Sequence, residues 1–530
     1  MSASDVKNIL AAAVPFDGAA ADDRALADYA RNDVGNGERL RDRFGRDLIW
    51  IEGSGWYVWT GAHWRRDPED SAAQRLAHKT AAAIDDEAAA LLAEARAELG
   101  EIDPNLSAML DRPGRKTDPD EVTVWRKRLT AHFGWAVTSG NQARIVAMLE
   151  SALPYLTRPP AALDADPDLF CVANGTLELR RRGLYFRRHD RADLITRMSP
   201  VEYDADAAAP KFRAFLARVQ PDVDRAVFLQ TFFGYCATGE TGEQVMAIMI
   251  GKGANGKSTL LNCVAGVQGD YAMHGPVESF LYQERGGGGD KASPDFARLP
   301  GSRLVLTSEP EIGSRLSESR VKAVTGGERI TTRRLHKDFF EFDPAFKLVL
   351  SCNSKPTIRG SDDGIWRRIM IVPFDVQIPK DERVLDYHLG LLADEGPGIL
   401  NWILDGWALW REAGLKPPAD VTAASEEYRR DSDPIGEFTR WAVVEGPGSL
   451  GATRLYDLYL AWVRRDGITP VSQTLFGRKM GDMGFHKVRA GIVYYDRAGL
   501  TAAALEFEEA AEKSPEPPPP DEPDEGYPMR

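Results

Sequence analysis

The stretch Val245-Met-Ala-Ile-Met-Ile-Gly-Lys-Gly-Ala-Asn-Gly-Lys-Ser-Thr259 decides the fold of this chain. Its first six residues are apolar and predict a buried strand. The glycine-rich segment that follows matches the phosphate-loop pattern G-x-x-x-x-G-K-[ST]. The residues after this loop have the apolar spacing of a helix. Strand, glycine loop and helix together predict an α/β domain built around a nucleotide-binding loop.

The residue types in this loop suit a triphosphate. Glycines let backbone N–H groups curl around a phosphate, and a helix N-terminus adds partial positive charge. Lys257 is predicted to reach the β- and γ-phosphates of ATP, and the Ser258 hydroxyl to bind Mg²⁺. The alternative is a chance glycine-rich turn. The predicted nucleotide-binding residues are Gly251, Lys252, Gly253, Ala254, Asn255, Gly256, Lys257, Ser258 and Thr259.

Size and charge limit the classes of protein to consider. At 530 residues the chain has room for about three or four domains. Its net charge of −14 argues against nucleic-acid binding, but residues 506–530 hold nine acidic and two basic residues, so half of the excess lies in one tail. Arginine clusters are therefore judged locally. The sequence contains no C-x-x-C pair, signal peptide or apolar run of transmembrane length. These features predict a soluble protein of the cytoplasm with no membrane partner.

Two further apolar runs end in polar residues that suit ATP hydrolysis. Residues 303–308 lead into Glu309, at the place where a phosphate-loop ATPase delivers an acid beside the metal and the attacking water. Glu311 is the second candidate for this acid, and a surface glutamate after an ordinary strand is the alternative. Asn353 ends another apolar run and is predicted to orient the attacking water. The predicted metal-binding residues are Ser258, Glu309 and Glu311.

Arginines precede one more apolar run. Arg367 and Arg368 are predicted either to form surface ion pairs with Asp362 and Asp363 or to act as an arginine finger on a neighbouring subunit. The predicted catalytic residues are Lys257, Glu309, Asn353, Arg367 and Arg368.

A β-hairpin is predicted over residues 329–340, with a basic tip. The tip residues either grip DNA or are ordinary solvated charges. The candidate DNA-binding residues of this hairpin are Arg333, Arg334, His336 and Lys337.

The region before the core alternates β-prone and helical segments. Its tryptophans at positions 50, 56, 59 and 64 either stack nucleic-acid bases or form the core of a small β unit, the commoner role of aromatic residues. Asn174-Gly175 predicts a β-hairpin. The arginines at 180–182 and 187–188 that follow either touch phosphates or belong to a solvated strand edge.

The C-terminal part has the order helix, helix, two-stranded β segment, which is typical of a winged helix-turn-helix. Arg478 and Lys479 on its second helix, with Lys487 and Arg489 on the wing, are predicted to contact mainly DNA phosphates, so binding is expected to weaken as salt rises. A protein-docking winged helix is the alternative. The predicted organisation is a mobile N-terminus (1–25), an α+β region (26–205), the nucleotide-binding core with helical flanks (206–430), the winged module (434–500) and an acidic, proline-rich disordered tail (506–530).

Taken together, these motifs resemble the phage and plasmid helicase–primase family, whose motor is a superfamily 3 AAA+ helicase and whose layout poxvirus replication helicases share. The resemblance implies an AAA+ core behind a poxvirus primase-helicase-like N-terminal region. It also implies a hexameric ring that uses ATP and Mg²⁺ to move along single-stranded DNA, generally 3′ to 5′, with a hairpin in its pore. One departure is Ser308, where relatives often carry a second acid. The motifs that carry the resemblance are residues 251–259, Glu309, Lys322-x-x-x-Gly326-Gly327-Glu328, Asn353, Arg367-Arg368, Gly35-Asn-Gly-Glu-Arg39, residues 56–64 and Asn174-Gly175-Thr-Leu-Glu-Leu179.

The leading hypothesis is therefore an ATP-dependent replicative DNA helicase of a phage, prophage or plasmid. Its expected partners are single-stranded and forked DNA, further copies of itself in a homohexamer, and a separate primase or polymerase. The alternatives are an ATP-dependent DNA-binding replication initiator and a bifunctional primase–helicase. The acid pairs Asp164/Asp166 and Asp222/Asp224 lie in polar segments rather than at strand ends, so we expect no primase site in this chain.

Overall fold

The computed structural model describes residues 22–282, 294–311, 313–333, 339–358, 363–465, 470–490 and 492–512. It divides into two compact units: residues 1–356 with 367–421 form unit 1, and residues 357–366 with 422–530 form unit 2. The expected α+β region and most of the expected nucleotide-binding core lie in unit 1, and the expected C-terminal module lies in unit 2.

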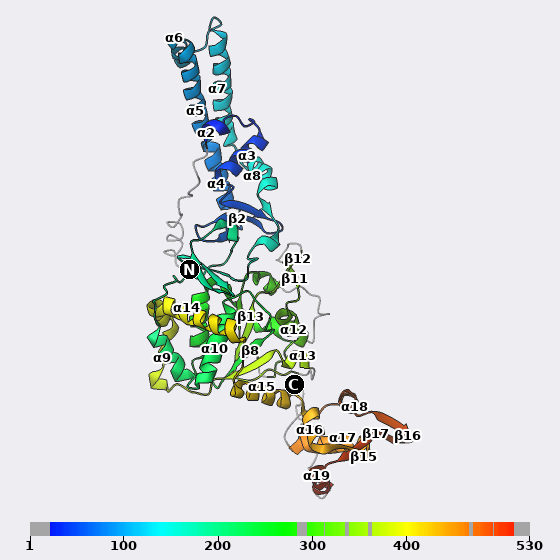
Figure 1. Ribbon diagram of the computed structural model, residues 1–530. Coiled ribbons are helices and arrows are strands. Elements are labelled where there is room, and N and C mark those ends of the chain that lie inside the picture. The colour runs from blue at the N-terminus through cyan, green and yellow to red at the C-terminus, as the bar shows by residue number, and fades with distance from the viewer. Residues whose placement is uncertain are drawn as a thin grey trace, which may run out of the picture. The chain divides into compact units, whose positions relative to one another are not determined.

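A five-stranded parallel sheet forms the centre of unit 1 (Figure 1). Its order is β14-β8-β13-β10-β9. The strands are nearly continuous apolar runs because both faces of a parallel sheet are covered. The expected α/β architecture is confirmed in this general form. The strands are β8 (Met246–Ile250), β9 (Ala272–Gly275), β10 (Leu304–Ser308), β13 (Lys347–Cys352) and β14 (Ile369–Pro373).

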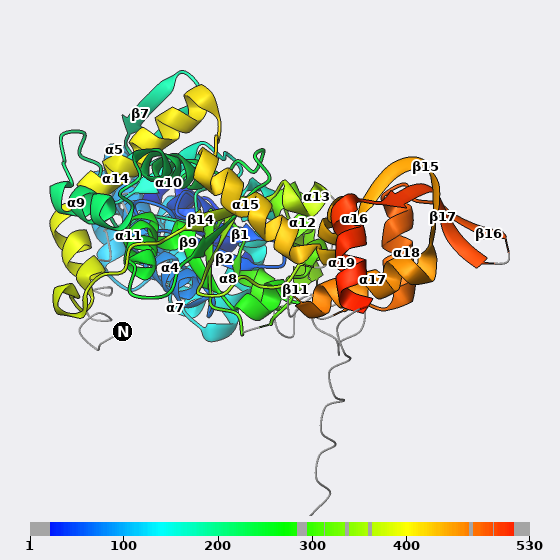
Figure 2. The same cartoon turned by 90° about the horizontal axis from the view of Figure 1, so that it is seen from below.

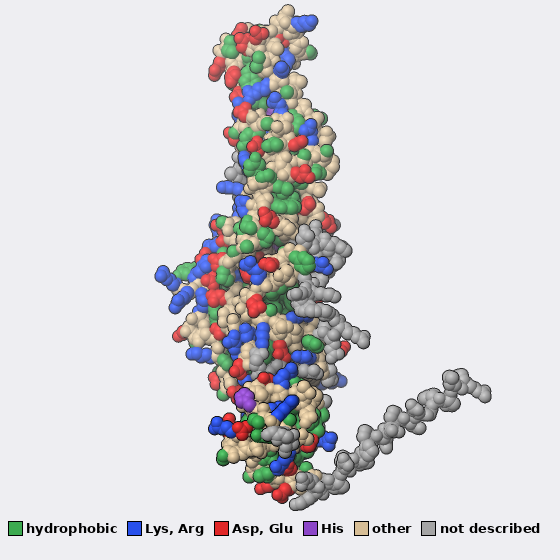
Figure 3. All heavy atoms as spheres, turned by 90° about the vertical axis from the view of Figure 1, so that its right-hand side faces the viewer, with side chains coloured by type: hydrophobic (Ala, Val, Ile, Leu, Met, Phe, Trp, Pro, Cys, Tyr) green, Lys and Arg blue, Asp and Glu red, His purple; other side chains and the backbone are tan. Residues whose placement is uncertain are grey.

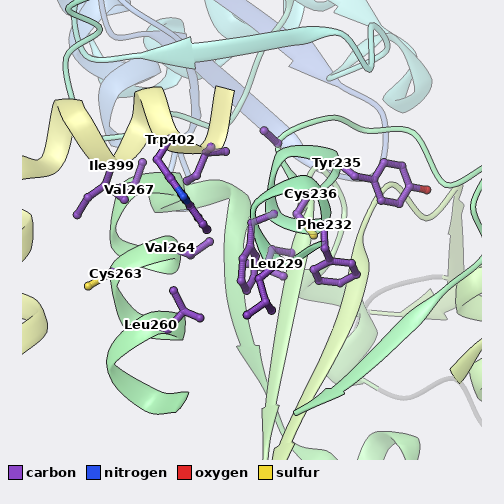
Figure 4. Packing of buried hydrophobic residues seen from close by; sticks show 14 of the residues in the cluster. Leu229, Phe232, Tyr235, Cys236, Leu260, Cys263, Val264, Val267, Ile399 and Trp402 are labelled. Atoms are coloured by element: carbon purple, nitrogen blue, oxygen red, sulfur yellow. The ribbon is translucent and has the colours of Figure 1, made fainter. Parts of the chain in front are cut away.

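Helices α9 (Pro210–Val219), α10 (Val223–Cys236), α11 (Lys257–Gln268) and α14 (Tyr387–Ala413) bury the main hydrophobic core of this unit. Figure 4 shows Leu260 and Val264 of α11 facing this core together with Trp402 of α14. Helices α10 and α14 approach closely because Gly234 of α10 faces Gly406 of α14. A Cβ at Gly234 would lie 2.0 Å from the backbone nitrogen of residue 407. The tryptophans at 402, 407 and 410 recur at helical spacing along α14 and are core residues, since they are 2%, 5% and 7% exposed.

The N-terminal part of unit 1 combines a four-stranded sheet, in the order β3-β2-β1-β4, with helices. Helices α5 and α7 run side by side (Figure 1). Trp56, Trp59 and Trp64 are buried at 3%, 7% and 2% exposure, so they form core rather than a stacking surface. The elements are α2 (Asp23–Leu26), α3 (Asp33–Phe44), β1 (Leu48–Ile51), β2 (Gly55–Trp59), β3 (Trp64–Arg66), α4 (Ser71–Ala82), α5 (Ile84–Ile102), α6 (Pro104–Ala108), α7 (Asp120–Ser139), α8 (Gln142–Leu156) and β4 (Thr157–Arg158).

Helix α3 precedes the tryptophan-rich segment of residues 50–64. The Asn32 side chain caps it by accepting a hydrogen bond from the Gly35 backbone. Arg39 of α3 is fully buried and donates to Glu87 of α5 at 2.8 Å. Each charge of this buried ion pair thus has the partner that burial requires. The sequence predicts a mobile N-terminus up to residue 25, but helix α2 (Asp23–Leu26) already begins at Asp23.

Two antiparallel sheets complete unit 1. Strands β5 (Leu169–Val172), β6 (Gly175–Arg180) and β7 (Gly183–Arg187) confirm the hairpin predicted around Asn174-Gly175. Helix α12 (Glu318–Gly326) ends at Gly327 in a left-handed conformation with φ 76°, which is typical of a glycine at a helix C-terminus. It leads into the predicted hairpin of β11 (Ile330–Arg333) and β12 (Phe339–Phe342). The hairpin tip, including Arg334, His336 and Lys337, lies outside the described residues.

Unit 2 contains a three-stranded sheet in the order β15-β17-β16. The expected wing has two strands, but β15 pairs with β17 and adds a third. The sequence also predicts a tail that is disordered from residue 506. Instead, α19 continues to Glu512, because Phe507 packs edge-to-face on Trp441 with ring centroids 5.5 Å apart. The elements are α13 (Asp363–Trp366), α15 (Ala419–Ser432, whose first residues belong to unit 1), α16 (Pro434–Ala442), β15 (Val443–Gly451), α17 (Ala452–Arg465), α18 (Gln473–Asp482), β16 (Lys487–Ala490), β17 (Ile492–Leu500) and α19 (Ala502–Glu512).

Candidate functional site

The glycine-rich loop connects β8 to the first residue of α11. Gly253, Ala254 and Gly256 all have positive φ angles, of 89°, 50° and 79°, a conformation that glycine adopts without strain. A Cβ at Gly253 would meet no heavy atom within 4 Å, whereas one at Gly251 would lie 2.4 Å from the carbonyl oxygen of Phe374. The loop is therefore packed against β14 at its start and open at its centre.

Lys257 lies at the carboxyl edge of the sheet and is only 5% exposed. Its Nζ donates to the carbonyl oxygen of Gly251 at 2.7 Å, to Asn255 Oδ1 at 3.3 Å and to Asn353 Oδ1 at 3.4 Å. Burial lowers the pKa of Lys257, and the electrostatic effects of Cys352 and Glu309 oppose that decrease. A cation that is held by neutral acceptors in an open loop is well suited to meet an anionic ligand.

Glu309 follows β10 directly and is exposed at the same edge. In the sheet, Ser308 is in register with Ser351 of β13, and Cys352 with Ile250 of β8. The strand ends that carry the glycine loop, Asn353 and Glu309 are therefore neighbours. Glu311 is exposed two residues further on. The structure thus brings Lys257, Asn353 and Glu309 together.

The remaining loop residues differ in exposure. Ser258 and Lys252 are exposed, and Thr259 is half-buried. Asn255 is buried and donates from Nδ2 to the carbonyl oxygen of Phe374 at 3.2 Å. Among the residues that the structure describes, no three His, Cys, Asp or Glu side chains are grouped so as to hold a metal ion. Mg²⁺ that binds with a nucleotide needs only one or two carboxylates, because phosphates and water supply the other ligands.

Arg367 and Arg368 lie at the opposite edge of the sheet. Ile369, which follows them, pairs with Met246 at the amino end of β8. Arg368 is 8% exposed and donates from Nε to Thr325 Oγ1 at 3.1 Å. Arg367 is exposed, and its Nη2 donates to Gln244 Oε1 at 3.2 Å. Five strand residues at about 3.3 Å each separate this edge from the loop by roughly 16 Å, so neither arginine belongs to the cluster around Lys257 in its own chain.

The structure shows no ion pair between these arginines and the two acids predicted as their surface partners, as far as the described residues extend. Asp362 lies outside the described residues, and Asp363 pairs with Arg429 at 2.5 Å. Sequence patterns gave no indication of Gln244, which receives a hydrogen bond from Arg368 as well, at 3.4 Å. A glutamine in a loop before a strand has no distinguishing pattern, and only the packed structure shows its contacts.

The candidate DNA-binding residues fall into two groups. Arg333 is exposed at the end of β11, with its guanidinium 5.3 Å from the Phe339 ring. In unit 2, Arg478 on α18 and Lys487 and Arg489 on β16 are exposed, and Lys479 is half-buried. A Cβ at Gly477 would lie 1.9 Å from Lys487 Nζ, so the strand lysine lies against α18 beside Arg478.

On the face shown in Figure 3, basic and acidic side chains are interspersed rather than segregated. None of the helices in the described parts of the chain combines the length and the apolar composition needed to cross a bilayer.

Two protein families match this chain. Residues 37–221 match the family described as D5 N terminal like, and residues 249–368 match a family of unknown function (DUF5906). The first match lies in the region before the sheet, and the second includes the glycine loop, Glu309, Asn353 and both arginines.

Curated relatives come from large DNA viruses of eukaryotes. A protein of Acanthamoeba polyphaga mimivirus, provisionally named a helicase, is 30% identical over 51% of this chain and 30% of its own length. A provisionally named helicase of Frog virus 3 is 26% identical over 49% of this chain and 28% of its own. A provisionally named primase of African swine fever virus is 26% identical over 39% of this chain and 22% of its own. The matches thus span less than a third of these relatives. The apo structure of the NrS-1 C-terminal region aligns over 61% of this chain and 94% of its own, at 11% identity and a TM-score of 0.39, which is too low to establish a common fold.

Proposed function

The chain belongs to the phage and viral helicase–primase family, and from that premise we propose that it is an ATP-driven DNA helicase of superfamily 3. The family and the names of its relatives support a role in DNA replication. One observation carries the proposal of an ATP-driven helicase. Lys257 Nζ lies 3.4 Å from Asn353 Oδ1, close enough to Glu309 to feel its charge, and the glycine loop next to it is open at its centre.

The proposed motor is an AAA+ phosphate-loop core. Its support is the strand order, in which β13 lies between the strand that leads to the loop and the strand that leads to Glu309. This order leaves Asn353 between the lysine and the acid, where an amide is suited to orient a water molecule attacking the γ-phosphate. The core is thus assembled for hydrolysis as well as for binding.

Each residue of the cluster has a distinct proposed role. Lys257 would exchange its neutral acceptors for the β- and γ-phosphate oxygens of ATP, and its charge would stabilise the transition state. Ser258 and Glu309, or Glu311 in its place, would hold Mg²⁺, which neutralises charge on the phosphates. The open space at Gly253 and the exposed Ser258 hydroxyl fit this ligand set.

We further propose a ring, with the hexamer as its expected size, in which Arg367 reaches the nucleotide of the neighbouring subunit. Support comes from its exposure and from its position at the sheet edge opposite its own loop. Arg368 is buried and bound to Thr325, so its proposed role is to support the strand start on which Arg367 lies.

DNA contacts are assigned to two modules. The hairpin of β11 and β12 is proposed to grip single-stranded DNA in the pore. Unit 2 is proposed to be a winged helix whose exposed Arg478, Lys487 and Arg489 meet phosphates. The support for the second assignment is that these three basic side chains are exposed and that Lys487 lies against α18, the helix that carries Arg478.

The test is steady-state ATP turnover by the full chain with and without single-stranded DNA, together with displacement of a labelled strand from a forked duplex. A helicase should show DNA-stimulated turnover and ATP-dependent displacement. An initiator in which ATP only drives assembly would bind ATP and DNA without stimulated turnover, and that result would reject the motor. Synthesis of primers from ribonucleotides on a single-stranded template would favour the bifunctional primase–helicase.

A further inference from the structure

The hairpin of β6 and β7 contains five arginines among residues 180–188, and the structure divides them into two classes. Arg180 and Arg187 are paired: Arg180 Nη2 lies 2.7 Å from Asp166 Oδ2, and Arg187 Nη2 lies 2.7 Å from Asp193 Oδ1. Both also contact Glu178, the nearer being Arg187 Nε at 2.5 Å. These ion pairs neutralise the acids at the base of the hairpin.

The other three arginines remain unpaired. Arg181 and Arg182 form the two-residue turn between β6 and β7, since Arg180 pairs with Gly183 across it. Arg188 follows the end of β7. All three side chains are exposed, and within the described residues none has an ion pair or a side-chain hydrogen bond. Positive charge is therefore available at both ends of β7.

Between these charges, β7 exposes two aromatic side chains. Tyr185 is 53% exposed and Phe186 is 45% exposed. The Phe186 ring packs against the Tyr203 ring, with centroids 5.1 Å apart. Tyr185 lies on the other face of the strand and is in register with Glu178 of β6. Strand β7 is the edge of the β5-β6-β7 sheet and projects at the margin of unit 1 (Figure 2).

We propose that this hairpin is a binding site for single-stranded nucleic acid, in which Arg181, Arg182 and Arg188 contact backbone phosphates and Tyr185 stacks on a base. The proposal rests on the proposed helicase function and adds a contact outside the pore hairpin and unit 2. Unpaired cations flanking an exposed ring are the combination that holds single strands without reading their sequence. The five residues of β7, at about 3.3 Å each, separate the turn from Arg188 by roughly 16 Å, enough for more than one phosphate.

Two alternative roles for this edge strand lead to different experimental outcomes. Charges on an edge strand can serve only to prevent edge-to-edge pairing, in which case removing them leaves DNA affinity unchanged. A peptide strand that adds to the edge of β7 would depend on backbone pairing rather than on the arginine charges. The acid nearest to Arg188 in sequence, Asp190, accepts a hydrogen bond from the Ala192 backbone and is exposed, so its repulsion of a phosphate is screened by solvent.

The experiment measures binding of a fluorescein-labelled oligothymidine to the full chain by anisotropy over a series of salt concentrations. The variant Arg181→Ala/Arg182→Ala/Arg188→Ala should bind about tenfold more weakly at low salt, and the slope of log affinity against log salt should fall by about 2, given roughly 0.7 per single-strand phosphate contact. Tyr185→Ala should weaken binding about fivefold or more without changing that slope, and Tyr185→Phe should retain the wild-type affinity.

The control is Arg115→Ala/Lys116→Ala, which removes two positive charges at an exposed adjacent pair elsewhere in unit 1; it should bind as the wild type does. If the triple variant keeps the wild-type affinity and slope while the wild type binds and is stimulated by DNA, the hairpin proposal is overturned and the helicase proposal stands. If the wild type binds no single-stranded DNA at all, both the hairpin proposal and the helicase proposal are rejected. Unchanged thermal unfolding of the variants excludes misfolding as a cause.

Discussion

Lys257 Nζ lies 3.4 Å from Asn353 Oδ1, although 96 residues separate the two in the chain. The contact exists because β13 is the direct neighbour of β8, so both strands end at the same edge of the sheet. It joins the residue best suited to bind phosphate to the residue best suited to orient water.

The first prediction concerns Lys257. Lys257→Ala should lower the ATP turnover number by at least about 10²–10³-fold, because it removes the cation that meets the transferring phosphoryl group. Lys416→Ala, at an exposed lysine outside the loop, is the control and should retain turnover. Turnover is measured on protein whose thermal unfolding matches that of the wild type; normal activity of Lys257→Ala would reject the nucleotide site.

Glu309 and Glu311 should differ sharply. Glu309 directly follows β10 and, with Cys352, acts electrostatically on Lys257, so Glu309→Gln should abolish most hydrolysis, by about 10²–10⁴-fold, while fluorescent ATP analogues still bind. Glu311→Gln should reduce turnover by less than about threefold, within the range of context effects. The reverse ranking would assign the acid to Glu311 instead.

Substitutions of the adjacent residues Arg367 and Arg368 should have different effects. Arg367→Ala should remove turnover without loss of stability, since an arginine finger contributes about 10³–10⁵ in rate. Arg368→Ala should cost about 1–3 kcal/mol of unfolding free energy, because it leaves the buried Thr325 hydroxyl without its guanidinium donor. Urea unfolding and ATPase assays on both variants measure these effects.

Action across a subunit boundary has its own test. Mixing Arg367→Ala subunits with Lys257→Ala subunits creates some interfaces that contain both intact residues. If Arg367 acts on its neighbour, mixed rings regain part of the ATPase activity. Mixed assemblies, verified by two affinity tags, that regain none would rule out action in trans.

A fourth prediction addresses coupling through the β11–β12 hairpin. His336→Ala/Lys337→Ala should leave basal ATPase nearly unchanged but remove stimulation by single-stranded DNA and unwinding of a forked duplex, because the basic tip is proposed to grip the DNA backbone. Parental unwinding rates in this variant would show that the hairpin is not the gripping element.

The last prediction is a pH dependence from Lys347. This side chain is buried, and its Nζ donates to the carbonyl oxygens of Thr238, Glu240 and Ala345 at 2.5, 3.1 and 3.3 Å. Burial lowers the pKa of Lys347 from 10.5 to about 7. Between these values the unfolded chain holds a proton that the native state lacks, so the contribution of Lys347 to stability rises with pH, by at most about 1.4 kcal/mol per pH unit.

Comparison with Lys347→Met isolates this effect from other titrating groups. The difference in unfolding free energy, wild type minus variant, should increase by about 2 kcal/mol between pH 7 and pH 9. Below pH 7 the difference should be flat, because both states then hold the proton. Urea unfolding at each pH measures it, and a difference that does not change with pH would show that Lys347 stays charged in the native state.

Local patterns predicted much of this structure. The apolar run, the glycine loop and the helix at Val245-to-Thr259 are visible in sequence because strand periodicity, glycine conformations and helix spacing depend on neighbouring residues. For the same reason the hairpins at β5–β6 and β11–β12, the C-cap at Gly327 and the buried tryptophans of α14 follow from the sequence.

Local sequence patterns thus identify the elements and the residues at their ends. Tertiary contacts determine which ends meet, because the order of strands in a sheet depends on contacts between distant segments. That order brought Asn353 and Glu309 to Lys257 and put Arg367 at the far edge. Tertiary packing also buried Arg368 against Thr325, added β15 to the predicted wing, and kept α19 helical through its contact with Trp441. Adjacent identical residues such as Arg367 and Arg368 differ only in burial, which sequence spacing does not encode.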